Sequence, residues 1–179
     1  PGLRVPGSWD GFELAVRAVL GQQISVAGAT TLTRRLVEQY GEDRLMKRDN
    51  LDRAFPKPEV IANASLEKIG LPKSRAATLR SMAQALIDGE ISFQAGQNMD
   101  AFVQKFTSLP GIGPWTAQYV AMRALRQPDA FPAGDLILQQ VMGGDKRLSE
   151  KETEARSQAW RPWRAYTVLH LWHLSGDLA

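Results

Sequence analysis

The chain has 179 residues, with 22 lysines and arginines against 19 aspartates and glutamates, a formal net charge of +3, two histidines and no cysteine. This length suits one domain or two small lobes that share a core. The lack of cysteine excludes disulfides, thiolate zinc sites, iron–sulfur clusters and a cysteine nucleophile, and two histidines argue against a histidine-rich metal site or a Ser-His-Asp triad. No apolar run approaches the ~20 residues that a membrane span needs. The mild basic excess is compatible with nucleic acid.

Helical spacing of apolar residues dominates the chain, and two-residue alternation is almost absent. For example, Phe12, Val16, Val19 and Leu20 fall on one stripe of a helix. We expect about nine or ten helices and no sheet, and therefore an all-α fold. The main expected helices lie near residues 12–20, 26–40, 59–64, 72–88, 101–107, 115–125, 136–140, 149–158 and 162–175.

Polar residues and glycines at the segment ends support these boundaries. Ser25 and Asp100 are placed to act as N-caps, and Gly41 and Gly89 are placed to end helices. Asp135 follows a loop and precedes another helix, so an N-cap is its simplest role from position alone.

The most informative stretch is the sequence LPGIG at residues 109–113, followed by a helix that begins with Trp115. Two glycines beside an apolar residue allow a tight turn in conformations closed to residues with a Cβ. Ile112 can then fill the space between the two helices. The glycine amides would form a cradle for a backbone phosphate, a contact that does not read base sequence. Gly111, Ile112, Gly113 and Thr116 are the residues of this stretch that we expect to lie at the DNA. The alternative is a helix connector that merely needs glycines.

Four segments in order resemble the helix–hairpin–helix DNA glycosylases, and among them most closely the bacterial 3-methyladenine DNA glycosylase II, or AlkA, type. They are FELAVRAVLGQQISVAGA (12–29), LPGIGPWTAQYVAMRAL (109–125), AFPAGDLILQQ (130–140) and WRPWRAYTVLHLW (160–172). The resemblance implies a two-lobed all-α glycosylase domain over residues 1–179, with its hairpin at about residues 100–125. AlkA-type proteins carry a further N-terminal domain, which we expect this chain to lack.

The resemblance also implies an activity and its residues. Family members require one aspartate in the loop after the hairpin, and Asp135 matches it. We therefore expect a monofunctional glycosylase that hydrolyses the N-glycosidic bond of alkylated purines, of the 3-methyladenine and 7-methylguanine type, in base-excision repair. Trp115, Tyr119 and Trp172 match aromatic positions of the base pocket, where stacked faces favour a cationic ring; their plainer role would be in the core. Strand-cutting relatives place a lysine where this chain has Trp115, so we expect no lyase activity.

Further expectations concern the DNA. Gln22 and Gln23 match the loop that fills the gap left by a flipped nucleotide, and the best-known AlkA-type member has leucine where this chain has Gln23; both glutamines could instead be ordinary polar loop residues. The main-chain carbonyls of Thr107, Leu109 and Ile112 match a monovalent cation site, for Na+ or K+, and no cofactor is required. We expect a monomer that binds damaged double-stranded DNA in the bacterial cytoplasm, with the nucleoid, and no membrane.

Three alternatives stay open at this point. The lesion could be another base, for example hypoxanthine. The chain could be a catalytically silent DNA-binding module, against which Asp135 argues, because such a module has no need for that carboxylate. It could also be a helical protein-interaction domain, which predicts no salt-dependent affinity for DNA.

Overall fold

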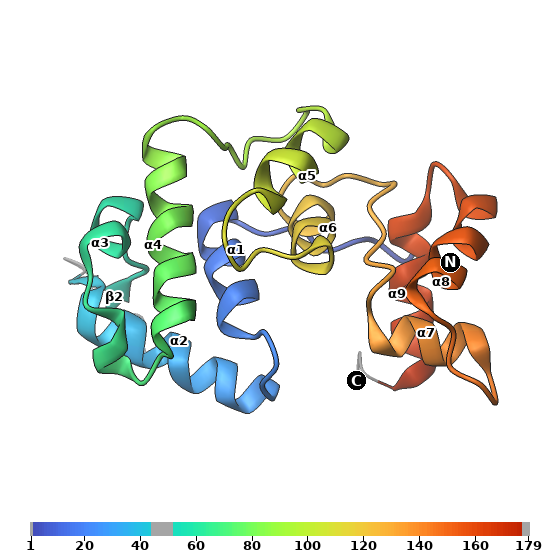
Figure 1. The fold of residues 1–179 in the computed structure, drawn as a ribbon, viewed down its shortest axis with the longest axis horizontal. Helices are drawn as coiled ribbons and strands as arrows, with labels where there is room; N and C mark the ends of the chain where they lie inside the picture. The colour runs from blue at the N-terminus through green and yellow to red at the C-terminus, as the bar shows by residue number, and fades with distance from the viewer. Residues whose placement is uncertain (1, 44–51, 177–179) are drawn as a thin grey trace. The chain divides into compact units, whose positions relative to one another are not determined.

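The structure is a computed structural model that describes residues 2–43 and 52–176. Within these residues the regular secondary structure is almost entirely helical, which confirms the predicted all-α class (Figure 1). The elements are α1 (Gly11–Leu20), α2 (Val26–Tyr40), β1 (Glu42–Asp43), β2 (Arg53–Ala54), α3 (Pro58–Asn63), η1 (Leu66–Ile69), α4 (Lys73–Ile87), α5 (Met99–Thr107), α6 (Pro114–Arg123), α7 (Leu136–Gly143), α8 (Glu150–Ser157), η2 (Gln158–Trp160) and α9 (Arg164–Ser175).

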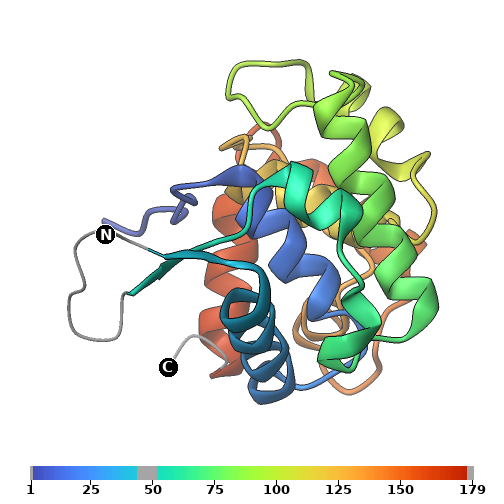
Figure 2. The same ribbon diagram turned by 90° about the vertical axis from the view of Figure 1, so that its left-hand side faces the viewer.

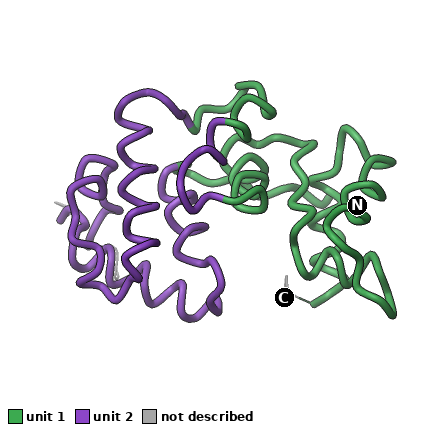
Figure 3. Tube along the Cα trace, viewed as in Figure 1, with its two compact units in different colours: residues 1–11, 93–104, 113–179 green, residues 12–92, 105–112 purple. Residues whose placement is uncertain are grey.

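The chain divides into two compact units (Figure 3). Unit 1 comprises residues 1–11, 93–104 and 113–179, and unit 2 comprises residues 12–92 and 105–112. Each unit is therefore built from segments that are distant in the sequence, with the turn after α5 in unit 2 and the whole of α6 in unit 1.

Unit 2 is organised around the apolar faces of α1 and α4. The stripe predicted for the first helix is buried, and α4 packs against α3. The core is completed by large aliphatic side chains from α2, α3, η1 and α4, namely Leu36, Ile61, Leu66, Leu79 and Met82. Burial of such side chains is the main favourable term that holds the helices together.

A small antiparallel pair in unit 2 contradicts the expectation of no sheet. Glu42 lies opposite Ala54 and Asp43 opposite Arg53, and Figure 2 shows the two short strands side by side beyond α2. Each strand has only two residues, which is too short for an alternating pattern to appear in the sequence.

Unit 1 has its own core, in which α7 packs against both α8 and α9. Large apolar side chains from α6, α7, α9 and the loop before α7 fill it: Val120, Met122, Phe131, Leu138 and Leu169. One charged side chain, Arg164, is buried with them at 2% exposure. A buried charge requires partners, and those of Arg164 are described with the site.

The observed helix caps agree with the predictions except at α5. The Ser25 hydroxyl accepts the Gly28 N–H at 3.2 Å, as predicted. At α5, however, the Asn98 side chain accepts the Ala101 N–H at 2.9 Å, and Asp100 lies inside the first turn. The prediction of Asp100 as the cap was wrong because asparagine caps a helix as well as aspartate does, and here it stands two residues earlier.

Helix α8 begins with a capping box between Ser149 and Glu152. The Ser149 hydroxyl donates to the Glu152 carboxylate at 2.7 Å and the Ser149 N–H donates to it at 2.8 Å. These hydrogen bonds lower the pKa of Glu152 below its ordinary value. The box therefore contributes its stability at pH values above the ordinary carboxyl pKa, and loses it as the pH falls through the lowered one.

The two glycines of the turn before α6 have different reasons to be glycine. Gly111 has a φ of 83°, and a Cβ placed on it would lie 2.1 Å from the Thr78 Oγ1. Gly113 has an extended backbone, with φ −93° and ψ 170°, and a Cβ there would meet no atom within 4 Å. The expectation that both glycines need a conformation closed to other residues is therefore wrong for Gly113.

This difference predicts opposite outcomes for two identical substitutions. Gly111→Ala should lower the free energy of unfolding by about 1–3 kcal/mol, because the left-handed backbone is strained for alanine and Thr78 must move. Gly113→Ala should change it by less than about 0.5 kcal/mol. Urea unfolding of both variants checks this, and an equal loss in the two would contradict the account of Gly111.

Candidate active site

Asp135 ends the loop that connects α6 to α7 and forms the N-cap of α7, as its position predicted. Its Oδ1 accepts the backbone N–H groups of Ile137 at 3.0 Å and Leu138 at 3.1 Å. Its backbone is extended, with φ −71° and ψ 124°. The side chain is largely buried, with the residue 8% exposed. The first turn of α7 therefore fixes the orientation of the carboxylate.

Two tryptophans also donate to this carboxylate. The indole Nε1 of Trp115, from α6, lies 2.9 Å from Oδ2, and that of Trp172, from α9, lies 3.3 Å from Oδ1. Oδ1 thus receives three N–H groups and Oδ2 receives one. Since a carboxylate oxygen has two acceptor positions in its plane, Oδ2 is the oxygen with capacity for another donor.

The three aromatic residues proposed from the sequence lie together beside Asp135. Trp115 and Tyr119 are four residues apart on α6 and stack at 5.2 Å between ring centroids, with an interplanar angle of 7°. Tyr119 and Trp172 are 6.4 Å apart and inclined at 48°. The structure thus unites Asp135 with all three in unit 1.

A cation already lies beside one ring of this cluster. The Arg123 guanidinium carbon is 5.8 Å from the centroid of Tyr119. Because a cation on an aromatic face uses part of the negative potential of that ring, Tyr119 attracts a second cation less strongly than it would without Arg123.

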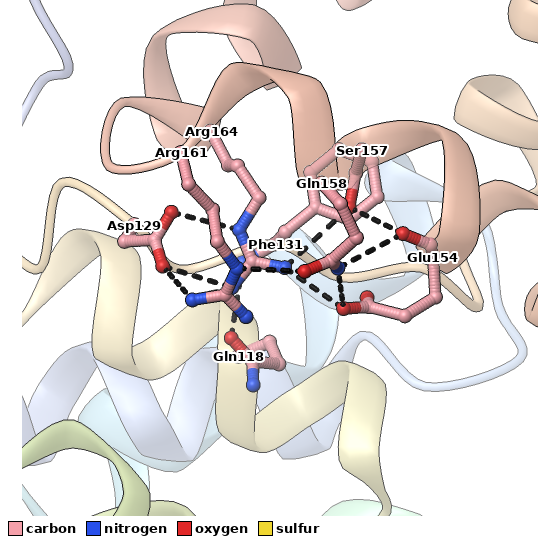
Figure 4. Close-up of polar contacts among 8 residues, drawn as sticks. All are labelled: Gln118, Asp129, Phe131, Glu154, Ser157, Gln158, Arg161 and Arg164. Carbon is pink, nitrogen blue, oxygen red and sulfur yellow. Dashed lines mark hydrogen bonds and ion pairs between the residues drawn. The ribbon is translucent and has the colours of Figure 1, made fainter.

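The loop that carries Asp135 is anchored by side chains that the sequence analysis missed (Figure 4). The Gln118 Oε1 accepts the Phe131 N–H at 3.0 Å. Arg164 forms a two-point ion pair with Asp129, through Nε to Oδ1 at 2.8 Å and through a terminal nitrogen to Oδ2 at 3.1 Å. A signal was available: Arg164 is a charged residue on the same helical stripe as the buried Val168 and Trp172.

A surface pocket of about 440 Å³ opens next to Trp115 in unit 1. It is lined by Pro114, Trp115, Gln118, Phe131, Ala133, Glu150, Lys151 and Glu154. The pocket therefore shares Trp115 with the aromatic cluster, but Asp135, Tyr119 and Trp172 are not among its lining residues.

The two glutamines of the loop after α1 have separate environments in unit 2. The Gln22 side chain donates to the Gly111 carbonyl at 3.2 Å, and the Gln22 carbonyl accepts from Arg75 at 2.8 Å. Gln23 is exposed and has a φ of 58°, which is uncommon for a residue with a side chain. Gln22 therefore ties this loop to the turn before α6, and Gln23 is its exposed tip.

The remaining predicted residues belong to the hairpin. Ile112 is buried at 5% exposure, and Thr116 at 3%. Since the Thr116 side chain is buried, the part of Thr116 suited to a phosphate is its backbone N–H in the first turn of α6. The Leu109 carbonyl accepts the Ile112 N–H at 3.1 Å, which closes the turn, and Thr107 is the last residue of α5 before it.

Comparison with known proteins gives the family. Residues 16–165 match the model described as "HhH-GPD superfamily base excision DNA repair protein". The chain belongs to this superfamily. It is 35% identical over 181 residues to DNA-3-methyladenine glycosylase 2 of Escherichia coli K12, covering 98% of this chain and 62% of the relative. It is 39% identical over 176 residues to the probable bifunctional transcriptional activator/DNA repair enzyme AlkA of Mycobacterium tuberculosis, covering 96% of this chain and 35% of that relative.

Solved structures give the same fold. The Schizosaccharomyces pombe 3-methyladenine DNA glycosylase Mag1, in complex with abasic DNA, matches with a TM-score of 0.79 and 22% identity, over 98% of this chain and 85% of that one. This HhH-GPD chain spans between about a third and three fifths of the length of the two curated relatives.

The described residues also bear on the expectations for membranes and metals. Among residues 2–43 and 52–176, no helix is both long and apolar enough to cross a membrane. The same residues contain no group of three or more histidine, aspartate or glutamate side chains placed to hold a metal ion.

The hydrogen bond between Trp115 and Asp135 predicts a specific conflict in Asp135→Asn. Asparagine keeps the helix cap through its oxygen, but its amide nitrogen then faces the Trp115 N–H across the present 2.9 Å. Rotating the amide does not relieve this conflict, because its nitrogen would then take the place of Oδ1 and face the three N–H donors there. We expect Asp135→Asn to cost about 1–3 kcal/mol of unfolding free energy, and less when Trp115→Phe removes the opposing donor.

A double-mutant cycle by urea unfolding measures this coupling, which should be about 1 kcal/mol or more. Trp163→Phe serves as the control, because Trp163 is exposed and its effect should add to that of Asp135→Asn. Additive losses for Trp115→Phe and Asp135→Asn would contradict the hydrogen bond.

Proposed function

We propose that this chain forms the catalytic part of a monofunctional DNA glycosylase, which hydrolyses the N-glycosidic bond of alkylated purines of the 3-methyladenine and 7-methylguanine type in double-stranded DNA. The observation that carries the proposal is the Asp135 carboxylate, held by two indole N–H groups that belong to an aromatic cluster. The names of the E. coli and S. pombe relatives support the choice of substrate.

The chemistry assigned to Asp135 follows from the charge of the substrate. A purine alkylated at N3 or N7 is cationic, so it leaves without a general acid to protonate it. The enzyme must instead stabilise the positive charge that develops on the sugar, and an adjacent carboxylate can do this. Oδ2 has a free acceptor position, so it is the oxygen that we assign to orient or deprotonate the attacking water.

The absence of strand cleavage rests on position 115. A lyase needs an amine that forms a Schiff base with the sugar. Here the corresponding side chain is the Trp115 indole, whose N–H is engaged with Asp135. The product of the reaction is therefore an abasic site in an intact strand.

DNA binding is assigned to unit 2 and to the start of α6. The open space at the Gly113 Cβ position leaves room for a phosphate near the first amides of α6. Flipping the target nucleotide out of the duplex costs roughly a few kcal/mol, less for a damaged base. We assign the exposed Gln23 to fill the gap that the flipped nucleotide leaves in the base stack.

We further propose that the protein acts as a monomer in the bacterial cytoplasm, with the nucleoid.

Release of free base from methylated duplex DNA tests the activity. The parent chain and Asp145→Asn, a matched change on an exposed loop, should release 3-methyladenine at equal rates. Asp135→Asn should release it at least about 100-fold more slowly. The strand should stay uncut until alkali is added.

Other outcomes would replace the proposal. Preferential release of hypoxanthine would change the lesion but keep the reaction. Binding to DNA without any base release would favour a silent DNA-binding module. If affinity for DNA did not fall with salt, or no DNA bound, a protein-interaction domain would be favoured.

We also propose a monovalent cation, Na+ or K+, at the main-chain carbonyls of Thr107, Leu109 and Ile112. Neutral carbonyl oxygens suit such an ion, and the Leu109 carbonyl uses only one of its two acceptor positions for the Ile112 N–H. DNA affinity should be several-fold higher in KCl or NaCl than in tetramethylammonium chloride at equal ionic strength. Equal affinity in the three salts would contradict this site.

A further inference from the structure

We infer that Arg164 is a positioning residue for Asp135. Its ion pair with Asp129 fixes one end of the loop at residues 129–135, while Trp172 holds the carboxylate at the other end, and both Arg164 and Trp172 belong to α9. The consequence for catalysis rests on the proposed function, whereas the structural link does not.

The Arg164–Asp129 pair has the geometry of a specific, directional contact. Nε lies 2.8 Å from Oδ1 and a terminal nitrogen lies 3.1 Å from Oδ2, so the two planar groups face each other. The exposed fractions of the side chains are 3% for Arg164 and 16% for Asp129. Such a two-point pair fixes distance and angle together, which a lysine cannot do.

The guanidinium is itself held in place by α8 and by the loop. Its other terminal nitrogen donates to Glu154 at 2.8 Å and to the Ser157 hydroxyl at 3.4 Å. Its carbon lies 5.8 Å from the centroid of the Phe131 ring (Figure 4). Arg164 therefore links the loop, through Asp129, to both α8 and α9.

Hydrogen bonds restrict the segment between Asp129 and Asp135 along its length. The Phe131 N–H donates to Gln118, and the Ala133 carbonyl accepts from Gln139 at 3.1 Å. Within the loop, Ala133 N–H donates to the Phe131 carbonyl at 3.0 Å, and Asp135 N–H donates to the Pro132 carbonyl at 2.9 Å. Asp129 and Asp135 are therefore joined by a short segment that is hydrogen-bonded within itself, through which we expect a displacement at Asp129 to reach Asp135.

Two side chains of α9, Arg164 and Trp172, fix where the loop at residues 129–135 lies along that helix. Arg164 and Trp172 are eight residues apart on α9, about 12 Å along its axis. The backbone adds a third contact at the Arg164 end, where Ala165 N–H donates to the Pro128 carbonyl at 2.9 Å. Loosening the Arg164 side chain leaves this backbone hydrogen bond and the Trp172 indole, at 3.3 Å from Oδ1, to hold the loop to α9.

Arg161 offers a matched control, because it pairs with the same Asp129 carboxylate. Its side chain is 48% exposed, and an exposed ion pair contributes little. Arg164→Lys and Arg161→Lys are thus the same chemical change on the same partner, one buried and one exposed. Asp129→Asn removes the charge from the other side of the pair.

Kinetics on methylated duplex DNA give the first test. Arg164→Lys and Asp129→Asn should lower kcat about 10- to 100-fold, with KM within about threefold of the parent, because the carboxylate is displaced while the DNA contacts remain. Arg161→Lys should keep kcat within about twofold. Measurements are made well below the melting temperature of each variant.

The indole N–H signals give a second test that does not need activity. The chain has five tryptophans, and in a ¹⁵N-labelled sample the signals of Trp115 and Trp172 report their hydrogen bonds to Asp135. Arg164→Lys and Asp129→Asn should move both signals toward their positions in Asp135→Ala, which offers neither indole a side-chain oxygen. The signal of the fully exposed Trp9 should not move.

Each outcome decides the inference. Unmoved Trp115 and Trp172 signals, or a kcat equal to that of the parent in an otherwise less stable Arg164→Lys, would reduce Arg164 to a stabilising residue. If Arg164→Lys does not fold, Asp129→Asn carries both tests. If the parent releases no base, the proposed function fails, and the indole signals still decide whether Arg164 positions Asp135.

Discussion

The structure of unit 1 depends on one carboxylate that accepts four N–H groups. Two come from the first turn of α7, one from α6 and one from α9. Because these donors belong to three helices, Asp135 can be satisfied only when all three are in place. The same residue thus ends a loop, starts a helix and joins the aromatic cluster, so folding and the arrangement of the candidate site are one event.

This constraint explains why the two oxygens of the Asp135 carboxylate differ in their hydrogen bonds. Oδ1 is saturated by structural donors, and Oδ2 is held by a single indole. An aspartate that only capped a helix would need neither tryptophan. The tryptophans in turn have one polar atom each, and placing it on the carboxylate leaves their faces for stacking. Two hydrogen bonds therefore fix the carboxylate relative to the aromatic cluster, which is the surface that we propose binds the base.

Much of this was open to prediction from the sequence, and the reasons differ from residue to residue. The helices followed from apolar spacing, as at Val16 and Val19, and the cap at Asp135 followed from a short polar side chain before a helix. The grouping of Trp115, Tyr119 and Trp172 came from resemblance, since no spacing links α6 to α9. The burial of Arg164 could be expected from its place on the stripe of Val168 and Trp172, but its partner could not, because Asp129 lies 35 residues away and no periodic pattern links the two. The error at Gly113 has another cause. A sequence does not distinguish a turn glycine that needs a left-handed backbone from one that only leaves open space beside the chain.

The hydrogen bond between Gln22 and the Gly111 carbonyl has a consequence for how damage would be found. It joins the loop with Gln23 at its tip to the turn before α6 inside one compact unit. In the proposed complex, the tip of this loop and residues 109–112 of the turn would then keep a constant spacing. Gln23 would then meet each base pair at the same distance from this turn, and a weakly stacked or weakly paired nucleotide would be displaced more easily than a normal one. Lesions would be sorted at this stage by the mechanical weakness of the stack, before any base reaches the carboxylate.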